Sequence, residues 1–261
     1  MSASSLLTAR QLEVSIGQTR VVRGLDLQLE PGQSLGVLGR NGSGKTTLLR
    51  SLAGLHRPDR GELLLDGHPL QTLDRRHIAR RLGMLLQHTN YAFEASCEAI
   101  ALIGRHPHLG PLATESAEDH ALARQALADV GLAELAERSC MDLSGGESRR
   151  LALATLLVQD PAIMLLDEPT NHLDPANQVA VLDVVIRRQR QSGRAAILAL
   201  HDVNLATCYC SHVLMLHGDG EWRCGPTAEL LNEAELSRLY GCRVRRVDDG
   251  QQQVFAVAGA R

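Results

Sequence analysis

The chain has 261 residues, 44% of them hydrophobic and 22% charged, which is ordinary for a globular protein and long enough for one large α/β domain or a core with a smaller subdomain. The formal net charge of -3 gives no electrostatic reason to expect a nucleic-acid partner. No apolar run approaches the roughly 18 residues that span a bilayer, and the N-terminus lacks the pattern of a signal peptide, so we expect a cytosolic protein that reaches a membrane only through a partner.

The N-terminal part of the chain predicts strands that lead into a helix. Residues 12–16 and 25–29 alternate as strands, with a turn at 17–19 between them. The apolar run 35–38 predicts a short buried strand, and residues 47–53 follow with helical spacing. A loop between such a strand and such a helix is the setting of a phosphate-binding turn.

A glycine-rich loop over residues 39–46 fills that position and matches the pattern G-x-x-x-x-G-K-[ST]. Glycines leave room for backbone N–H groups to converge on phosphate oxygens, and the helix adds its positive N-terminal end. Lys45 can reach the β- and γ-phosphates, and the Thr46 hydroxyl can ligate Mg²⁺. We therefore expect a nucleotide to be bound by Gly39, Arg40, Asn41, Gly42, Ser43, Gly44, Lys45, Thr46 and Thr47.

Two further strand signals precede a long helical stretch. Residues 61–67 predict a strand with turn residues at each end, and residues 84–86 predict a short buried strand that ends at Gln87. Helical patterns then dominate from about residue 94 to 158.

Strand signals return in the last part of the chain. They lie at 162–166 and 195–200, with a helix over 178–190 between them, and this order predicts βαβ units and a parallel sheet. The tail predicts two short helices and a strand pair, 243–247 and 252–257.

These elements predict one domain over 1–261 in which a helical segment interrupts a sheet-forming sequence. We expect the core at 1–87 and 160–261, and a helical subdomain at 88–159.

Two groups of residues are given no functional role. The six cysteines form no CxxC pair, so we expect reduced and mostly buried thiols rather than a zinc site. The arginine pairs, among them Arg149-Arg150, lie in mixed-charge segments and are expected on solvated helix faces, with contact to a partner as the alternative for one of them.

The apolar strand at 163–166 ends in two carboxylates, Asp167 and Glu168. In a phosphate-loop nucleoside triphosphatase, an acid at the first position holds the Mg²⁺ shell, here beside Thr46, and Glu168 is placed to polarise an attacking water. Acidic residues after a strand are common in α/β proteins, so the pairing with the glycine-rich loop carries this prediction.

Leu143-Ser144-Gly145-Gly146-Glu147 opens a predicted helix directly ahead of the acidic strand. Its small residues leave backbone N–H groups free, which favours a second anion site. The same pattern also suits an ordinary helix N-cap at Ser144, and its place in the chain favours the anion site.

With these residues in place, the chain resembles the ATP-binding cassette (ABC) ATPases over nearly its whole length. Six motifs stand in family order: the Walker A loop at 39–46, the Q-loop at Gln87, the signature at 143–147, the Walker B strand ending at Asp167-Glu168, the D-loop at 171–174 and the H-loop at 200–202. The resemblance implies an α/β phosphate-loop NTPase fold with a RecA-like core, an N-terminal antiparallel β region and an inserted helical subdomain.

The resemblance also implies a homodimer that hydrolyses ATP. Two copies would face each other head to tail and sandwich two ATP molecules with Mg²⁺. Ser144, Gly145 and Gly146 of one copy would contact the γ-phosphate bound by Lys45 of the other. Asp174 would couple the two sites across the dimer.

Catalytic roles follow from the same resemblance. Glu168 would act as general base or position the water, and His201 would contact the γ-phosphate. Gln87 would contact Mg²⁺ or the water and report nucleotide state to the helical subdomain, while Thr46 and Asp167 complete the metal site.

The chain departs from the family pattern at two positions. The signature ends in Glu147 where many members carry Gln. Ile16 stands where an aromatic side chain usually stacks on adenine. Isoleucine can give apolar contact but no π-stacking, a difference that concerns base affinity and selectivity and not the phosphate chemistry.

Gly104-Arg105-His106-Pro107-His108 looks like the G-R-x-P-H segment of importer ATPases that serve iron–siderophore, haem and cobalamin permeases. The resemblance implies a peripheral subunit at the cytoplasmic face of the inner membrane, bound to two transmembrane permease subunits and served indirectly by a periplasmic or surface substrate-binding protein. Two other interpretations remain for Arg105, His106 and His108: solvated loop residues, or a weak metal-binding cluster.

A different class of function remains as the alternative. Soluble scaffold ATPases of iron–sulfur cluster assembly also carry an S-G-G-E signature. The G-R-x-P-H segment argues for the importer.

Overall fold

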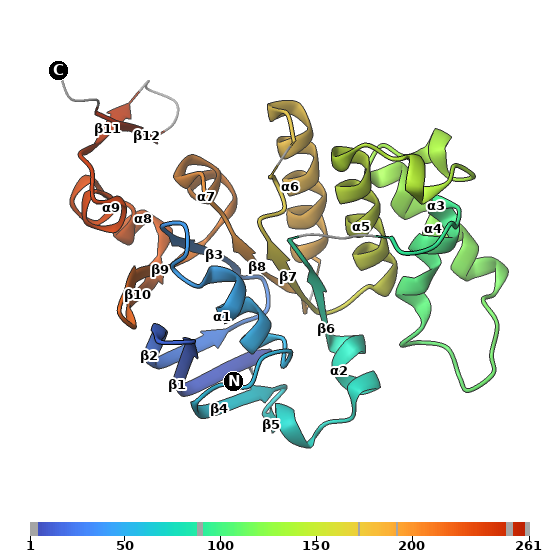
Figure 1. The fold of residues 1–261 in the computed structure, drawn as a ribbon, viewed down its shortest axis with the longest axis horizontal. Helices are drawn as coiled ribbons and strands as arrows, with labels where there is room; N and C mark the ends of the chain where they lie inside the picture. Colours follow the sequence, from blue (N-terminus) through green and yellow to red (C-terminus); the bar gives the residue numbers. More distant parts are fainter. Residues whose placement is uncertain (1–4, 88–90, 172, 192, 249–252, 259–261) are drawn as a thin grey trace.

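The computed structural model describes residues 5–87, 91–171, 173–191, 193–248 and 253–258. Its strands form two large sheets beside a group of helices, with a small hairpin near the C-terminus (Figure 1). His172 of the predicted D-loop and Gln252 of the last predicted strand lie outside the described residues. Within the described ranges, no helix has the length and apolarity to cross a membrane.

An antiparallel sheet contains the N-terminal strands, in the order β2-β1-β4-β5. Its strands are β1 (Leu7–Ile16), β2 (Thr19–Leu29), β4 (Arg60–Leu65) and β5 (His68–Pro69). This sheet confirms the predicted antiparallel region. β1 begins earlier than predicted because register shifts near Gln11 break the alternation of buried and exposed residues in its first half.

A second sheet has the strand order β10-β9-β3-β8-β7-β6. Its strands are β3 (Ser34–Gly39), β6 (Leu82–Leu85), β7 (Ile163–Asp167), β8 (Ala195–Ala199), β9 (His212–Gly218) and β10 (Glu221–Pro226). Neighbouring strands are parallel except for β9 and β10, which confirms the predicted parallel sheet. Every residue of β3, β7 and β8 is buried, which is why these strands read as continuous apolar runs.

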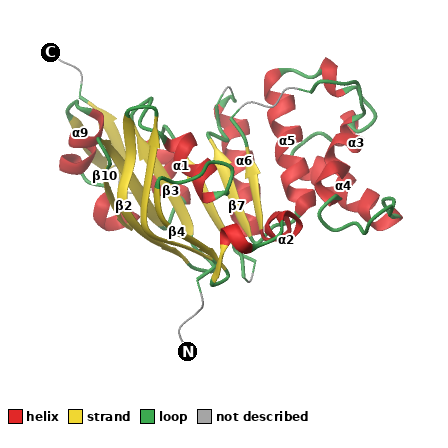
Figure 2. Cartoon of the chain, turned by 60° about the horizontal axis from the view of Figure 1, so that its bottom comes forward, coloured by secondary structure: helices red, strands yellow, loops and turns green. Residues whose placement is uncertain are grey.

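Helices cover both faces of the parallel sheet (Figure 2). α1 (Lys45–Leu52) packs between the two sheets, where Leu48, Leu49 and Leu52 are fully buried. α6 (Pro175–Gln189) and α7 (Val203–Tyr209) belong to the hydrophobic cluster on the other face. The carboxyl ends of β3, β6, β7 and β8 thus share one edge of the sheet, where ligands bind in open α/β folds.

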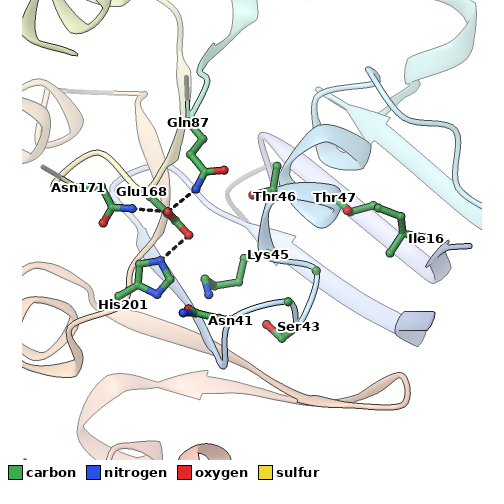
Figure 3. Close-up of a pocket in the computed structure, with 12 residues that line it drawn as sticks. Ile16, Asn41, Ser43, Lys45, Thr46, Thr47, Gln87, Glu168, Asn171 and His201 are labelled. Carbon is green, nitrogen blue, oxygen red and sulfur yellow. Dashed lines mark hydrogen bonds and ion pairs between the residues drawn. The ribbon is translucent and has the colours of Figure 1, made fainter. Parts of the chain in front are cut away.

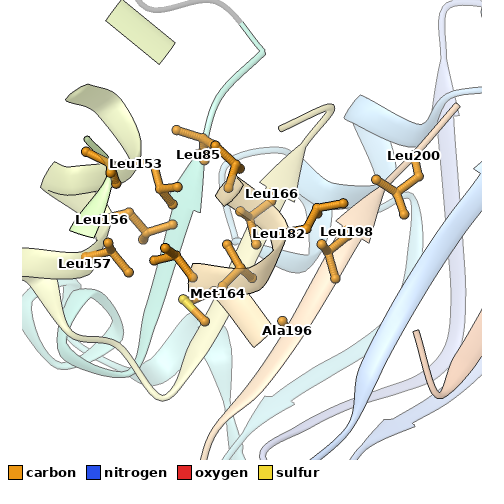
Figure 4. Close-up of a cluster of buried hydrophobic side chains, with 14 of the residues drawn as sticks. Leu85, Leu153, Leu156, Leu157, Met164, Leu166, Leu182, Ala196, Leu198 and Leu200 are labelled. Carbon is orange, nitrogen blue, oxygen red and sulfur yellow. The ribbon is translucent and has the colours of Figure 1, made fainter. Parts of the chain in front are cut away.

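The segment between β6 and β7 is helical, as predicted. It contains α3 (Cys97–Leu102), η2 (Ile103–Arg105), α4 (Ala117–Asp129), η3 (Ala133–Leu135), η4 (Cys140–Asp142) and α5 (Gly145–Gln159). Leu153 and Leu156 of α5 share one hydrophobic cluster with Leu85 of β6 and Met164 of β7 (Figure 4). Because this cluster crosses from helices to sheet, the division of the chain into a core and a helical subdomain remains a prediction.

The C-terminal part holds the predicted helices and strand pair as α8 (Thr227–Leu230), α9 (Glu233–Tyr240), β11 (Val244–Asp248) and β12 (Gln253–Val257). Five elements were not predicted from the sequence: α7, β9, β10, η1 (Leu70–Thr72) and α2 (Arg75–Arg81). Two hydrogen bonds join β12 to Asn204 of α7. Asn204 Oδ1 accepts from Phe255 N at 2.8 Å, and Asn204 Nδ2 donates to Phe255 O at 3.2 Å.

All six cysteines are free. Cys97, Cys140 and Cys210 are buried, whereas Cys208 and Cys242 are exposed, so the expectation of mostly buried thiols holds for only part of the set.

Candidate active site

The glycine-rich loop joins the carboxyl end of β3 to the N-terminus of α1. Gly44, at the N-cap of α1, has a φ of 93°, and a Cβ there would lie 2.4 Å from Val21 Cγ2. A Cβ on Gly39 would lie 2.5 Å from Ser43 Oγ. Gly44 therefore needs glycine, because a side chain there would combine a left-handed φ with a clash, whereas a side chain at Gly39 would require Ser43 to move.

Lys45 is the only lysine in the chain and the first residue of α1. It is 4% exposed, and its Nζ donates to the carbonyl oxygens of Gly39 at 3.0 Å and Arg40 at 3.4 Å. Burial lowers the pKa of Lys45 below its ordinary value, while the charges of Glu168 and Asp167 oppose that shift. The amine is thus folded onto the loop, at the place where an anion would meet it.

A cavity of about 470 Å³ opens beside this loop (Figure 3), and its volume is within the usual range for small-molecule sites. It is lined by Ile16, Asn41, Gly42, Ser43, Gly44, Lys45, Thr46, Thr47, Gln87, Glu168, Asn171 and His201. Ile16 lies next to Thr47, on the side away from Glu168 (Figure 3). The predicted site residues outside this lining are Gly39, Arg40, Ser144, Gly145, Gly146, Asp167 and Asp174.

The Glu168 carboxylate is the centre of a hydrogen-bonded group in this cavity. His201 Nε2 lies 2.5 Å from Oε1, Gln87 Nε2 donates to Oε2 at 2.7 Å, and Asn171 Nδ2 also donates to Oε2 (Figure 3). Glu168 is 7% exposed and has a φ of 52°, which is uncommon for a residue other than glycine. Asn171 was predicted only as part of the D-loop motif and not as a partner of Glu168; its position three residues after the carboxylate is the available sequence signal.

Asp167 is fully buried at the end of β7. Thr46 Oγ1 donates to Asp167 Oδ1 at 3.1 Å, and Asp167 Oδ2 is buried without a hydrogen-bond partner among the described residues. Burial raises the pKa of Asp167, and the Thr46 hydrogen bond opposes this shift. A partnerless carboxylate oxygen beside a hydroxyl suits Mg²⁺, which takes hard oxygen ligands from one or two side chains, water and phosphate. These residues therefore fit the predicted cation.

Ser144, Gly145 and Gly146 stand at the N-terminus of α5. Ser144 Oγ accepts from Glu147 N at 3.3 Å, and the Glu147 carboxylate accepts from Ser144 N at 2.8 Å, which together form a capping box. Ser144 is thus an ordinary N-cap in this chain. Ser144 and Gly145 are exposed, and a capping box leaves other N–H groups of the first turn without partners inside the helix, so capping is compatible with an anion site.

Asp174 is exposed and caps α6. Its Oδ1 accepts from Asn177 N at 2.9 Å and its Oδ2 accepts from Asn177 Nδ2 at 2.7 Å. These hydrogen bonds lower the pKa of the Asp174 carboxyl. Asp174 therefore has a structural role at this helix terminus in the single chain, and its predicted role across a dimer remains a prediction.

Arg149 is buried, so its expected place on a solvated helix face is wrong. Its guanidinium donates to main-chain carbonyl oxygens that follow β6 and end β7. Leu153 and Leu156 stand at i+4 and i+7 from Arg149 and are buried, so all three residues share one face of α5. Ala154 and Leu157 stand at the same spacings from Arg150 and are also buried, so helical spacing alone does not single out Arg149.

The segment 104–108 packs against the end of α5. A Cβ on Gly104 would lie 2.3 Å from Thr155 O, Arg105 forms an ion pair with Asp119 at 2.6 Å, and His108 Nε2 lies 2.8 Å from Gln159 O. The interpretation of Arg105 and His108 as solvated loop residues is therefore wrong, whereas His106 is exposed. In the part of the chain that the structure describes, no group of three or more His, Cys, Asp or Glu is arranged for a metal ion.

Comparisons with known proteins agree with one another. The family model described as ABC transporter matches residues 22–171. The achromobactin transport ATP-binding protein CbrD of Dickeya dadantii (strain 3937) is 36% identical over 93% of this chain and 90% of that protein. The hemin import ATP-binding protein HmuV of Myxococcus xanthus (strain DK1622) is 39% identical over 93% of this chain and 92% of that protein. A solved structure of an inward-facing ABC transporter assigned to the metal-chelate type matches 98% of both chains, with a TM-score of 0.84 and 27% identity.

Proposed function

This chain belongs to the ABC transporter family of ATPases, and we propose that it is the ATP-hydrolysing subunit of an importer for an iron chelate, haem or cobalamin-like substrate. The observation that carries the hydrolytic part is the Glu168 carboxylate, held by Gln87, Asn171 and His201 in the cavity beside the phosphate-binding loop. A carboxylate fixed in this way can orient a water molecule for attack on a phosphate that the loop holds.

The residues of the cavity divide the work between binding and chemistry. The loop and the N-terminus of α1 would hold the triphosphate, with the Lys45 ammonium moving from loop carbonyls to phosphate oxygens. Thr46 and Asp167, with Gln87, would hold Mg²⁺, which supplies neutralisation of phosphate charge when it is bound. Glu168 would accept the water's proton or orient it, and His201 would hold both Glu168 and the γ-phosphate in place.

A second copy of the chain would complete the site. Ser144, Gly145 and Gly146 are predicted to bind a γ-phosphate, yet none of them lines the cavity of their own chain. Ser144 and Gly145 are exposed and Gly146 is half-buried at the N-terminus of α5, a position that suits contact with a nucleotide held by a partner. A head-to-tail homodimer with two ATP molecules satisfies both observations.

The import assignment is supported by the names of the relatives and by the segment 104–108. The CbrD and HmuV relatives, which match over nine tenths of this chain, are named for achromobactin transport and hemin import. We place this chain at the cytoplasmic face of the plasma membrane, bound to two permease subunits. A substrate-binding protein would deliver the substrate to these permease subunits. No observation favours the iron–sulfur scaffold alternative, so it is not proposed.

The experiment is affinity isolation of the tagged protein from detergent-solubilised membranes of its native host, with mass spectrometry of whatever is recovered. The proposal predicts a polytopic permease in about equal amount to the ATPase. An untagged host is the control for nonspecific recovery. Recovery of soluble partners alone would withdraw the import claim and leave the ATPase assignment standing.

A further inference from the structure

Arg149 lies on α5 and hydrogen-bonds the main chain of two residues of the cavity, Gln87 and Glu168. It lies on α5 shortly after the N-cap residue Ser144. Its Nη1 donates to Leu86 O and, at 3.1 Å, to Gln87 O, while its Nη2 donates to Asp167 O and, at 2.9 Å, to Glu168 O. One guanidinium on α5 thus bonds two segments, 86–87 and 167–168, that are far apart in the sequence.

The position suits arginine for a physical reason. Arg149 is 8% exposed, and its hydrogen-bond partners among the described residues are main-chain oxygens rather than carboxylates. Burial lowers the pKa of Arg149, whereas the nearby charges of Asp167 and Glu168 raise it. The planar fork of arginine has donors on both terminal nitrogens, so it can bond two segments at once; the single ammonium of lysine cannot reproduce that geometry.

The bonded carbonyls belong to residues whose side chains meet in the cavity. Gln87 Nε2 donates to Glu168 Oε2 at 2.7 Å, and Arg149 holds the main-chain oxygens of both residues. Glu168 also has the left-handed φ of 52°, a conformation that persists only where surrounding contacts hold it. The two carbonyls on either side of that φ are both acceptors of Arg149 Nη2.

We propose that Arg149 is a positioning residue that couples the placement of α5 to the geometry of Gln87 and Glu168. When the N-terminus of α5 binds a partner's nucleotide, the position of α5 is fixed. The hydrogen bonds of the Arg149 guanidinium then fix the main chain of Glu168 relative to α5. This inference rests on the proposed function, because it takes Glu168 as the group that orients water. It makes hydrolysis, rather than nucleotide binding, the step that depends on Arg149.

The next residue on the helix provides a matched control. Arg150 Nη1 donates to Val130 O at 3.2 Å and to Gly131 O at 3.3 Å, both within the helical segment and away from the cavity. Arg150→Gln therefore removes an arginine of the same helix, α5, which also bonds two carbonyl oxygens but does not contact the catalytic group. Arg149→Gln and Arg149→Lys are the test variants.

The measurement is single-turnover ATP hydrolysis, expressed per ATP bound, together with ATP affinity by equilibrium binding. Normalising to bound ATP removes the effect of any misfolded fraction. For Arg149→Gln we expect the rate per bound ATP to fall at least about tenfold, equal to about 1.4 kcal/mol, with affinity within about threefold of wild type. Arg149→Lys, which keeps the charge but not the fork, should show the same loss, and Arg150→Gln should keep the wild-type rate within about twofold.

Each other outcome is decisive. A rate per bound ATP for Arg149→Lys equal to that of Arg150→Gln would overturn the proposal, since charge alone would then suffice. The same equality for Arg149→Gln would overturn it as well. Absence of hydrolysis in the wild-type protein would instead overturn the role of Glu168, which separates the failure of the proposed function from the failure of this inference.

Discussion

His201 Nε2 lies 2.5 Å from Glu168 Oε1, although the two residues follow different strands of the parallel sheet. β7 and β8 are neighbours in that sheet, so their carboxyl ends deliver both side chains to one edge. The imidazole and the carboxylate thereby fix each other beside the phosphate-binding loop. This pair is the part of the cavity in which the proposed chemistry takes place.

The first prediction concerns His201. Replacing it with alanine removes one of the groups that hold the Glu168 carboxylate, so we expect kcat to fall by about 10²-fold with little change in ATP affinity. Steady-state hydrolysis and equilibrium binding check this. His68→Ala, an exposed histidine on β5, is the control and should match wild type. A wild-type kcat for His201→Ala would show that His201 does not contribute to hydrolysis.

A second prediction uses the fact that Lys45 is the chain's only lysine. An amine-directed ester should modify Lys45 and the α-amino group, and Mg²⁺ with ATP should protect Lys45 alone. Because burial lowers the pKa of Lys45, its neutral, reactive form should accumulate at lower pH than that of an ordinary lysine. Bound phosphate favours the ammonium and should move the midpoint of labelling to higher pH. Peptide mass spectrometry across pH measures both effects, and equal labelling with and without ATP would contradict the assigned site.

A third prediction concerns the base of the nucleotide. Ile16 is 54% exposed and lines the cavity, but it offers no aromatic face. Ile16→Tyr should tighten ATP binding at least about fivefold, because stacking of a base on an aromatic side chain contributes about 1 kcal/mol or more. Leu55→Tyr, at an exposed position outside the cavity, should leave affinity unchanged. An unchanged affinity for Ile16→Tyr would place the base elsewhere.

A fourth prediction concerns the packing of the segment 104–108. A Cβ on Gly104 would lie 2.3 Å from Thr155 O, so Gly104→Ala should cost about 1–3 kcal/mol and lower Tm by at least about 2 °C. Gly110→Ala adds a Cβ that would meet only Ala113 Cβ at 3.9 Å and should shift Tm by less than about 1 °C. Differential scanning calorimetry compares the two, and equal Tm values would show that Gly104 does not limit this packing.

Short-range patterns predicted most of the strands and helices around the site. The loop from Gly39 to Thr46 needed only its own residues and its flanks to be recognised, since glycine conformation and helix start are local properties. Asp167 and Glu168 were found because an apolar strand ends there. The sequence did not reveal that Gln87 and His201 meet at Glu168, because that contact depends on the order of β6, β7 and β8 in the sheet.

The failures have a physical cause as well. Arg149 and Arg150 are chemically identical neighbours, and only the carbonyl oxygens of distant segments make one of them an interior residue. β1 was predicted too short because the irregular register near Gln11 removes the alternation that marks a strand. Both the burial of Arg149 and the start of β1 therefore depend on tertiary contacts, which local composition does not show.

The most direct test of the whole account is the behaviour of Glu168→Gln with Mg²⁺ and ATP. Sedimentation velocity and ATP titration should find a dimer that binds two ATP molecules, and hydrolysis should fall by about 10²-fold or more because the amide cannot accept the water's proton. Glu62→Gln, on the exposed part of β4, is the control and should hydrolyse ATP at the wild-type rate. Undiminished hydrolysis by Glu168→Gln would contradict the account, since the group at the centre of the cavity would then not be the one that activates water.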